Sequence, residues 1–287
     1  MPTQAPTIPV QHHSHTAVGW WTPDGTGAPE FGEAALTRAV HHVAAPVQLV
    51  EVDGQLGVAH GGTATLETNG VAAKGARRLV AYAPALRPEQ LGDPGFRASH
   101  GLTYPYVAGA MANGVGSEEI VEAMARAGMV GFFGAAGLSP GRIESAIERI
   151  QRNVGDRPYG FNLIHAPAEP QSEAAVVELY LRRHVRLVSA SAYIELTLPL
   201  IRYRVAGIFR GSDGTVITPN KVIAKVSRVE VARKFFSPPP AQMLQTLVDG
   251  GFITQRQAVM AAEIPVAEDL TAEADSGGHT DNQPAIS

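Results

Sequence analysis

The stretch that decides the fold is residues 104–137, YPYVAGAMANGVGSEEIVEAMARAGMVGFFGAAG. A short apolar run over Tyr106–Ala110 predicts a strand, and a loop of small residues follows it. Apolar residues then recur at helical spacing between Ile120 and Met124, which predicts a helix that begins after Ser117. The order is therefore strand, loop and helix.

Both ends of this helix carry recognisable signals. Ser117 suits the N-cap, and Glu118 lies where the helix dipole favours an acid. Gly128 is placed to end the helix, and the apolar run Met129–Phe133 predicts a second strand directly behind it. The stretch is thus predicted to be one βαβ unit.

The loop between Ala108 and Gly114 is almost free of long side chains, so a flat ligand could lie against its backbone. A dinucleotide-binding fingerprint is excluded, because after Gly114 and Gly116 its third glycine would fall at Glu119. The same small residues also suit a tight turn between a strand and a helix. The sequence leaves both interpretations open.

Composition narrows the class of protein. The 287 residues are 45% hydrophobic, which is enough for a sizeable core, and the net charge of -4 without a basic stripe argues against a nucleic-acid partner. The absence of cysteine excludes disulfides and thiolate sites. Met1–Val10 lacks the features of a leader, and apolar runs fall short of the ~20 residues that span a bilayer. We therefore expect a cytoplasmic protein without a membrane partner.

The N-terminal part is predicted to be separate from the rest. Residues 1–30 are rich in Pro, Gly and Thr, which predicts a flexible arm. Its histidines His12, His13 and His15 lack carboxylate or thiolate partners, so we expect no metal site there. Residues 31–100 combine one amphipathic helix pattern with strands and glycine turns, which predicts a small α+β module.

Residues 101–287 alternate apolar runs with helix patterns, which is typical of parallel strands joined by helices. About six such units are predicted, and they suit either an open doubly wound sheet or most of an eightfold barrel. Beyond residue 137, strands are predicted at Tyr159–Ile164, Val185–Ser189, Lys221–Val226 and Ile264–Leu270. Helices are predicted from Ser139, at Glu173–His184, at Ala192–Tyr203 with a bend at Pro199, and at Arg228–Phe236, Ala241–Val248 and Thr254–Glu263.

Three positions in this region are candidates for chemistry. Asn162 lies near a strand end and either offers its amide to a ligand or closes a turn. Lys225 lies inside a strand, where it needs a ligand or a buried ion pair. His279 follows Gly277 and Gly278 just beyond the last strand and either projects into a site or is an ordinary turn residue. The serine of Gly137–Gly141 is no nucleophile, because the proline after it has no N–H to give to an oxyanion hole.

Five segments together resemble a known family: YPYVAGAMANG, FFGAAGLSP, YGFNLIHAP, NKVIAKVSR and EADSGGHTDN. They are similar to the PfaD family, the trans-acting, flavin-dependent enoyl reductases of polyunsaturated fatty acid and polyketide synthesis. That family belongs to the nitronate monooxygenase-like flavoproteins. The resemblance covers nearly the whole chain, and NKVIAKVSR and ADSGGHTDN are the segments that point to this branch.

The resemblance implies a TIM-type (β/α) barrel that holds FMN at the carboxyl ends of its strands. It implies that Asn162 and Lys225 bond the flavin ring or ribityl chain, that Gly277 and Gly278 lie near N5, and that His279 is the active-site histidine. The residues implied to pass beside the ring are Ala108, Gly109, Ala110, Met111, Ala112 and Asn113.

The implied reaction reduces an enoyl thioester carried by an acyl carrier protein of a polyketide or fatty acid synthase. NADPH or NADH would reduce the FMN, and His279 would supply or position the α-proton. Two alternatives stay open. One is a flavin oxidase of the nitronate monooxygenase type, with His279 as base, and the other is a non-catalytic docking partner of a synthase.

One feature departs from the family pattern. Such barrels hold phosphate in the loops after strands seven and eight, whereas about six units are predicted here. We therefore expect an incomplete barrel over 101–287, truncated before strands seven and eight, whose phosphate-binding residues lie beyond Ser287. As a truncated product, a split gene or a fragment, it would be inactive alone and would need a complementing C-terminal chain to cover its strand edges.

Overall fold

The βαβ unit predicted over residues 104–137 is present in the computed structural model, which describes residues 16–67, 72–167 and 169–272. It consists of β7 (Val107–Ala108), α3 (Glu118–Arg126) and β8 (Val130–Phe133). Ser117 is the N-cap, and its Oγ accepts a hydrogen bond from the Ile120 amide at 3.4 Å. The first strand is shorter than predicted, because its ladder with β8 extends over two residues.

The second unit, which begins at Gly92, is built on six parallel strands. The later strands are β9 (Gly160–Ile164), β10 (Leu187–Ser191), β13 (Lys221–Val226) and β14 (Asp269–Ala272). Their order in the sheet is β7-β8-β9-β10-β13-β14, so each strand lies beside the next parallel strand in the chain. This serial order is that of a barrel, because a doubly wound sheet reverses its order at a switch point. The described strands form six units of an incomplete TIM-type barrel, as predicted.

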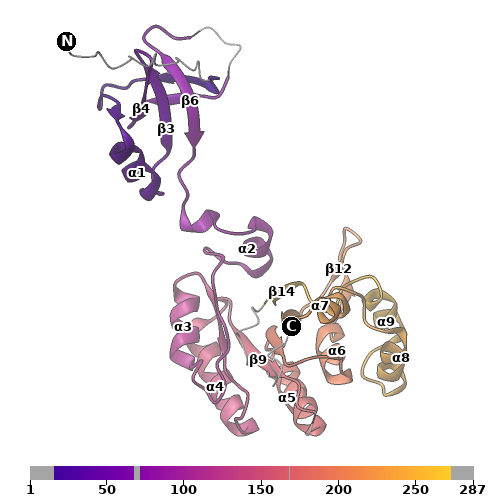
Figure 1. Cartoon of the computed structure of the whole chain (residues 1–287). Coiled ribbons are helices and arrows are strands. Elements are labelled where there is room, and N and C mark those ends of the chain that lie inside the picture. The colour runs from indigo at the N-terminus through magenta and orange to yellow at the C-terminus, as the bar shows by residue number, and fades with distance from the viewer. Residues whose placement is uncertain (1–15, 68–71, 168, 273–287) are drawn as a thin grey trace, which may run out of the picture. The chain divides into compact units, whose positions relative to one another are not determined.

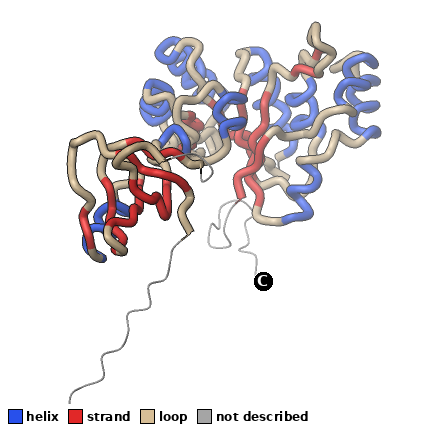
Figure 2. The backbone as a smooth tube through the Cα atoms, turned by 90° about the horizontal axis from the view of Figure 1, so that it is seen from above, coloured by secondary structure: helices blue, strands red, loops and turns tan. Residues whose placement is uncertain are grey.

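Helices cover the outer side of this curled sheet (Figures 1 and 2). Their apolar faces and the outward strand residues form the largest core, in which Phe133, Phe161 and Val188 are fully buried. The helices are α4 (Pro140–Val154), α5 (Pro170–Arg182), α6 (Leu198–Val205), α7 (Val229–Phe235), α8 (Ala241–Asp249) and α9 (Gln255–Ala261).

Two predicted elements begin five or six residues later than predicted. The helix predicted from Ala192 begins at Leu198, because Thr197 caps it and Pro199 occupies its first turn instead of bending it. The strand predicted at Ile264–Leu270 starts only at Asp269. Between α6 and β13 the chain forms a short hairpin of β11 (Phe209–Arg210) and β12 (Val216–Ile217).

The amino ends of the strands are closed by α2 (Pro94–His100). The buried His100 ring bonds through Nε2 to Asp269 Oδ2 at 2.7 Å and packs on Phe96 with ring centroids 4.7 Å apart. Lys221 Nζ donates to the Ser99 carbonyl. Since Lys221 and Asp269 begin β13 and β14, α2 belongs to this unit, whereas the sequence had assigned it to the first module.

The first unit is an antiparallel sheet in the order β2-β4-β3-β6-β1-β5. Residues 1–30 were predicted to be an arm, but Trp21 of β1 is 1% exposed in the core, and its Nε1 donates to the Gly61 carbonyl. This strand was not predicted, because GWWT is very short and lies within a Pro- and Gly-rich segment. The elements are β1 (Gly19–Thr22), β2 (Glu30–Phe31), α1 (Glu33–His41), β3 (Val47–Val52), β4 (Gln55–Ala59), β5 (Thr63–Thr65), β6 (Arg77–Ala83) and the 3-10 helix Pro88–Gln90.

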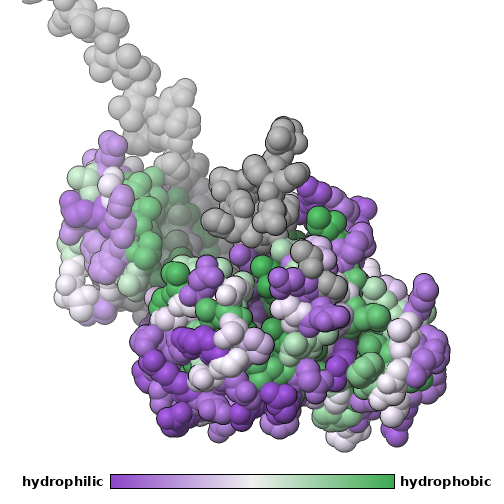
Figure 3. Space-filling model, turned by 90° about the horizontal axis from the view of Figure 1, so that it is seen from below, coloured by the Kyte–Doolittle hydropathy of each residue, from purple (hydrophilic) through white to green (hydrophobic). Residues whose placement is uncertain are grey.

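The exterior of the second unit is mixed in character. Hydrophilic side chains dominate the face shown in Figure 3, and hydrophobic ones appear between them. Within the described residues, no helix has both the length and the apolar composition needed to cross a bilayer.

Helices α3 and α4 are joined by a well-made ion pair. Both guanidinium nitrogens of Arg142 donate to the Glu118 carboxylate, at 2.5 and 2.9 Å, and the Glu118 side chain is only 7% exposed. These hydrogen bonds from Arg142 lower the pKa of Glu118 below its ordinary value of 4.5. A bidentate pair of this kind is stronger than an ordinary surface salt bridge.

We expect Glu118→Gln to reduce the free energy of unfolding at pH 7 by about 1–2 kcal/mol, because the two charge-assisted bonds are lost. The depressed pKa means that the stabilisation is complete above pH 4.5 and disappears as the pH falls through the folded-state pKa. Urea unfolding at pH 7 and at pH 3.5 measures this, and the difference between the proteins should shrink at the lower pH. Glu178→Gln, at the more exposed pair with Arg202, is the control and should cost less. Equal losses at both sites would contradict the assignment.

Candidate functional site

The inner face of the half barrel is defined by residues that lie side by side on neighbouring strands. Asn162, Ser189, Ile223 and Asp269 are successive lateral partners across β9, β10, β13 and β14. Because side chains alternate between the faces of a sheet, residues two positions away on each strand share this face. The second apolar cluster, which includes Phe132, lies on the same side. The inner face is therefore apolar in part and carries polar groups from several strands.

A cavity of about 480 Å³ opens onto this face. Lys225 and Thr271, which line it, are lateral partners near the carboxyl ends of β13 and β14. Two residues singled out from the sequence, Gly109 and Lys225, are thus brought together by the fold. The residues that line the cavity include Gly109, Phe132, Ser189, Ile223, Lys225 and Thr271.

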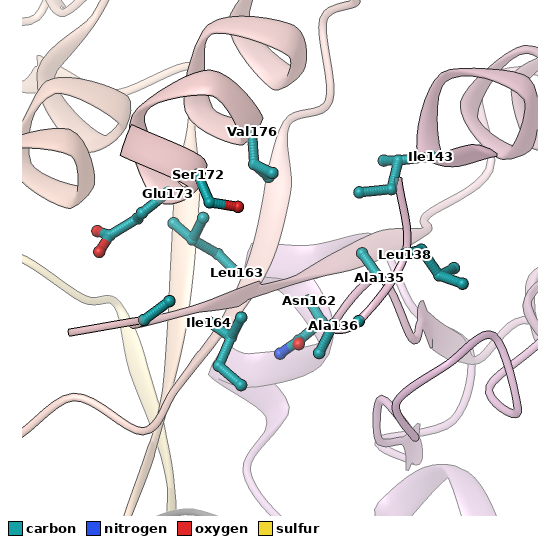
Figure 4. Close-up of a pocket in the computed structure, with 12 residues that line it drawn as sticks. Ala135, Ala136, Leu138, Ile143, Asn162, Leu163, Ile164, Ser172, Glu173 and Val176 are labelled. Carbon is teal, nitrogen blue, oxygen red and sulfur yellow. The ribbon is translucent and has the colours of Figure 1, made fainter. Parts of the chain in front are cut away.

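Asn162 is almost fully buried and is the lateral partner of Ser189, which lines this cavity. Its Nδ2 donates to the Ser189 carbonyl at 3.1 Å and to Ser191 Oγ at 2.8 Å, while its own carbonyl accepts from the Tyr180 hydroxyl. It also lines a small cavity of about 50 Å³ outside the barrel, where Figure 4 shows it beside Ala136. The amide is therefore oriented by β10, which leaves Oδ1 as the atom able to accept from a ligand.

The loop poor in side chains packs against the loop that follows β8. The amides of Asn113 and Gly114 donate to the carbonyls of Ala136 and Gly134, at 2.8 and 2.9 Å. A methyl group on Gly134 would lie 1.6 Å from the Met111 carbonyl oxygen, so only glycine fits there. The small residues thus have a structural use, the close approach of two backbones, in addition to any contact with a ligand.

The predicted ring-side residues are not equivalent. Ala108 pairs with Gly131, which abuts Val121 of α3, so Ala108 lies on the helix side of the sheet. Ala110 packs against the inner apolar cluster. Met111 and Ala112 are exposed, and Asn113 has a positive φ of 56°. Gly277, Gly278 and His279, together with His12, His13 and His15, lie outside the described residues.

A polar network just beyond β9 and β10 was not predicted. The buried Glu173 carboxylate of α5 accepts hydrogen bonds from Tyr193 at 2.9 Å and from Thr197, and it bonds His165 Nδ1 at 2.9 Å. The rings of His165 and Tyr193 stack 5.3 Å apart. Burial raises the pKa of Tyr193, and the nearby Glu173 carboxylate adds to the effect. Sequence reasoning found Glu173 only as a helix residue, because tertiary packing and not local spacing joins these groups.

We expect Gly134→Ala to destabilise the protein by about 3 kcal/mol, because the added methyl group collides with backbone atoms that cannot rotate away. Thermal or urea unfolding measures the loss. Gly141→Ala is the matched control: it lies in the first turn of α4, its methyl group would meet nothing within 4 Å, and it should be neutral or stabilise by up to about 1 kcal/mol. A Gly134 variant as stable as the control would show that the two loops do not require this approach.

The chain is similar to several known proteins. The sequence pattern of one family, described as nitronate monooxygenase, matches residues 97–285. The polyketide biosynthesis protein PksE of Bacillus subtilis is 46% identical over 200 residues, which are 69% of this chain and 26% of that protein. One of the polyunsaturated fatty acid synthase subunits of Thraustochytrium sp. is 44% identical over 194 residues, which are 68% of this chain and 13% of that subunit. The chain thus spans about a quarter or less of these relatives.

A solved structure is similar as well. The enoyl reductase domain of MlnA, from the macrolactin biosynthesis cluster of Bacillus amyloliquefaciens, superposes with a TM-score of 0.63 at 40% sequence identity. The superposition covers 64% of this chain and 42% of that one. The chain therefore spans less than half of that enoyl reductase domain.

Proposed function

The chain belongs to the nitronate monooxygenase family, and we propose on this premise that it supplies the flavin-binding face of an FMN-dependent enoyl reductase acting in trans. The observation that carries the proposal is the inner cavity, where Gly109, Lys225 and Thr271 meet at the carboxyl side of the parallel strands. Ligands of barrel enzymes bind at this end of the strands. The similarity to the MlnA enoyl reductase domain favours reduction over oxidation of a nitronate.

The residues of the cavity fit a flavin. Its volume of about 480 Å³ is in the range of cofactor pockets. Phe132 and Ile223 give it an apolar wall, and the exposed backbone at Gly109 admits a flat ring. Lys225 would hold a polar edge of the ring or the ribityl chain, and Asn162 Oδ1 would accept from it. When bound, FMN would supply the transfer of a hydride.

Residues of this chain would exclude water, orient the cofactor and handle the proton. The alternating apolar and polar lining of the cavity would exclude water from the reacting atoms while it fixes the orientation of the cofactor. His279 follows β14, and we assign it the donation or positioning of the α-proton, with Gly277 and Gly278 giving the cofactor access to the backbone. The reductant would be NADPH or NADH.

The substrate class and partners follow from the relatives. PksE and the fatty acid synthase subunit are named for polyketide and polyunsaturated fatty acid synthesis. We therefore assign enoyl thioesters on an acyl carrier protein as substrate and a synthase as partner. Because the second unit has six described parallel strands, a further chain segment that completes the barrel is part of the proposal.

The first test measures FMN binding by the whole chain. We expect Lys225→Met to weaken FMN binding on the order of tenfold, because a charge-assisted contact is lost from the cavity. Quenching of flavin fluorescence gives the dissociation constant. Arg256→Met, on the exposed side of α9, is the control and should bind FMN like the unmodified chain. A protein that remains colourless when saturating FMN is supplied would instead favour a docking role.

The second test separates the two flavin chemistries. Together with the segment that completes the barrel, the chain is given NADPH or NADH with crotonyl-acyl carrier protein, or a nitronate with oxygen. We expect oxidation of the nicotinamide only with the enoyl substrate, and a loss of at least about 100-fold in rate for His279→Ala. Oxygen consumption with the nitronate alone would identify the oxidase, and an undiminished rate in His279→Ala would remove the histidine from the mechanism.

A further inference from the structure

A second cavity, of about 340 Å³, lies at the opposite end of the strands from the proposed flavin site. It is bounded by the residues that lead into β9, β10 and β13 and by the end of α2. Three cationic side chains line it, those of Arg157, Arg186 and Lys221. The whole chain carries a net charge of -4, whereas the wall of this cavity carries three cations, so the local charge is opposite in sign to that of the chain.

These cations are held in place without being neutralised. Arg157 donates to the Val154 carbonyl at 3.2 Å, and Lys221 donates to the Ser99 carbonyl. Arg186 donates to Asn220 Oδ1 at 2.8 Å and contacts His184 Nδ1 at 3.2 Å. None of the four partners is a carboxylate, and in the described part of the chain none of the three cations forms an ion pair with one.

Several arginines elsewhere in this unit form ion pairs with acids instead. Arg142, Arg183 and Arg204 each lie against a glutamate, which satisfies their charge within the protein. Among the residues that line the cavity, the acid is the exposed Asp156. Asp269, which is near, bonds the His100 ring and none of the three cations. The positive field inside the cavity is therefore available to a ligand from solution.

The position of Arg186 is fixed by a buried amide. Asn220 is 1% exposed, and its Nδ2 donates to the carbonyls of Tyr203 and Ala206 at 2.8 and 2.9 Å. Its Oδ1 then faces Arg186, which orients the guanidinium fork, while the other terminal nitrogen of the fork contacts His184 Nδ1. Such preorganisation lowers the entropic cost of binding an anion.

We propose that this cavity binds the phosphate group of a small molecule. Two guanidinium forks and one ammonium group suit an anion with several oxygens better than a single carboxylate. The Tyr159 ring and two prolines on the wall leave room for an organic part of the ligand. Lys221 and Lys225 are four residues apart on β13, or about 13 Å, so this site is separate from the proposed flavin cavity.

The test is calorimetric titration of the whole chain with pyrophosphate, followed by adenosine diphosphate. We expect saturable one-to-one binding, weakened on the order of tenfold in Arg186→Gln and again in Lys221→Gln. Arg152→Gln removes an exposed cation of α4 outside the lining and should change nothing. Circular dichroism melts of each variant show whether lost binding reflects lost folding. Tighter binding of the nucleotide would identify the organic part as a nucleoside, and equal binding would identify a bare phosphate group.

Three outcomes would overturn the proposal. They are the absence of saturable binding to the unmodified chain, unchanged binding in the folded Arg186→Gln and Lys221→Gln double variant, and displacement of pyrophosphate by riboflavin, which carries no phosphate. The last would mean that the anion occupies the flavin site instead. Since the titration needs neither flavin nor substrate, it can succeed or fail independently of the proposed reductase activity.

Discussion

The close approach of two backbones at the carboxyl side of β7 and β8 organises the candidate site. The Met111 carbonyl lies where a side chain on Gly134 would have to be, and three amide-to-carbonyl bonds join the two loops around it. This contact closes the gap between the first two strand-to-helix connections, so that Gly109 and Ala110 are turned toward the interior. With a larger residue at Gly134, the loops would separate and the rim of the cavity would lose its shape.

The alternation of side chains along parallel strands then distributes chemistry over the inner face. Lys221, Ile223 and Lys225 share that face of β13 because they are spaced by two residues. One lysine reaches the amino end, where α2 closes the sheet, and the other reaches the carboxyl end, where the loops gather. A single strand thus supplies a cation to each of two cavities, and the apolar residue between them belongs to the core that separates the ends.

Local signals explain why much of the fold could be predicted from the sequence. Ser117 and Ser139 cap helices as expected, and β13 has the predicted bounds, because each depends on neighbouring residues alone. The alternation of about six strands with helices left two topologies open, and the resemblance favoured the barrel. The partners of Glu173 were inaccessible, since three separate segments bring them together. The side of the sheet on which Ala108 lies was not predicted either. A strand of two residues is too short to show, in the sequence, the alternation of side chains between the two faces.

The bond between His100 and Asp269 joins residues 169 positions apart, at the beginning and near the end of the described second unit. On a ribosome that adds about 5–20 residues per second, α2 emerges roughly 10–30 s before its partner strand. During that interval the helix can dock only on the strands already made, and the sheet stays open at its amino side. The amino side of the sheet is consequently closed by α2 only late in synthesis. Because this long-range contact forms slowly, nascent chains need protection from one another until it has formed.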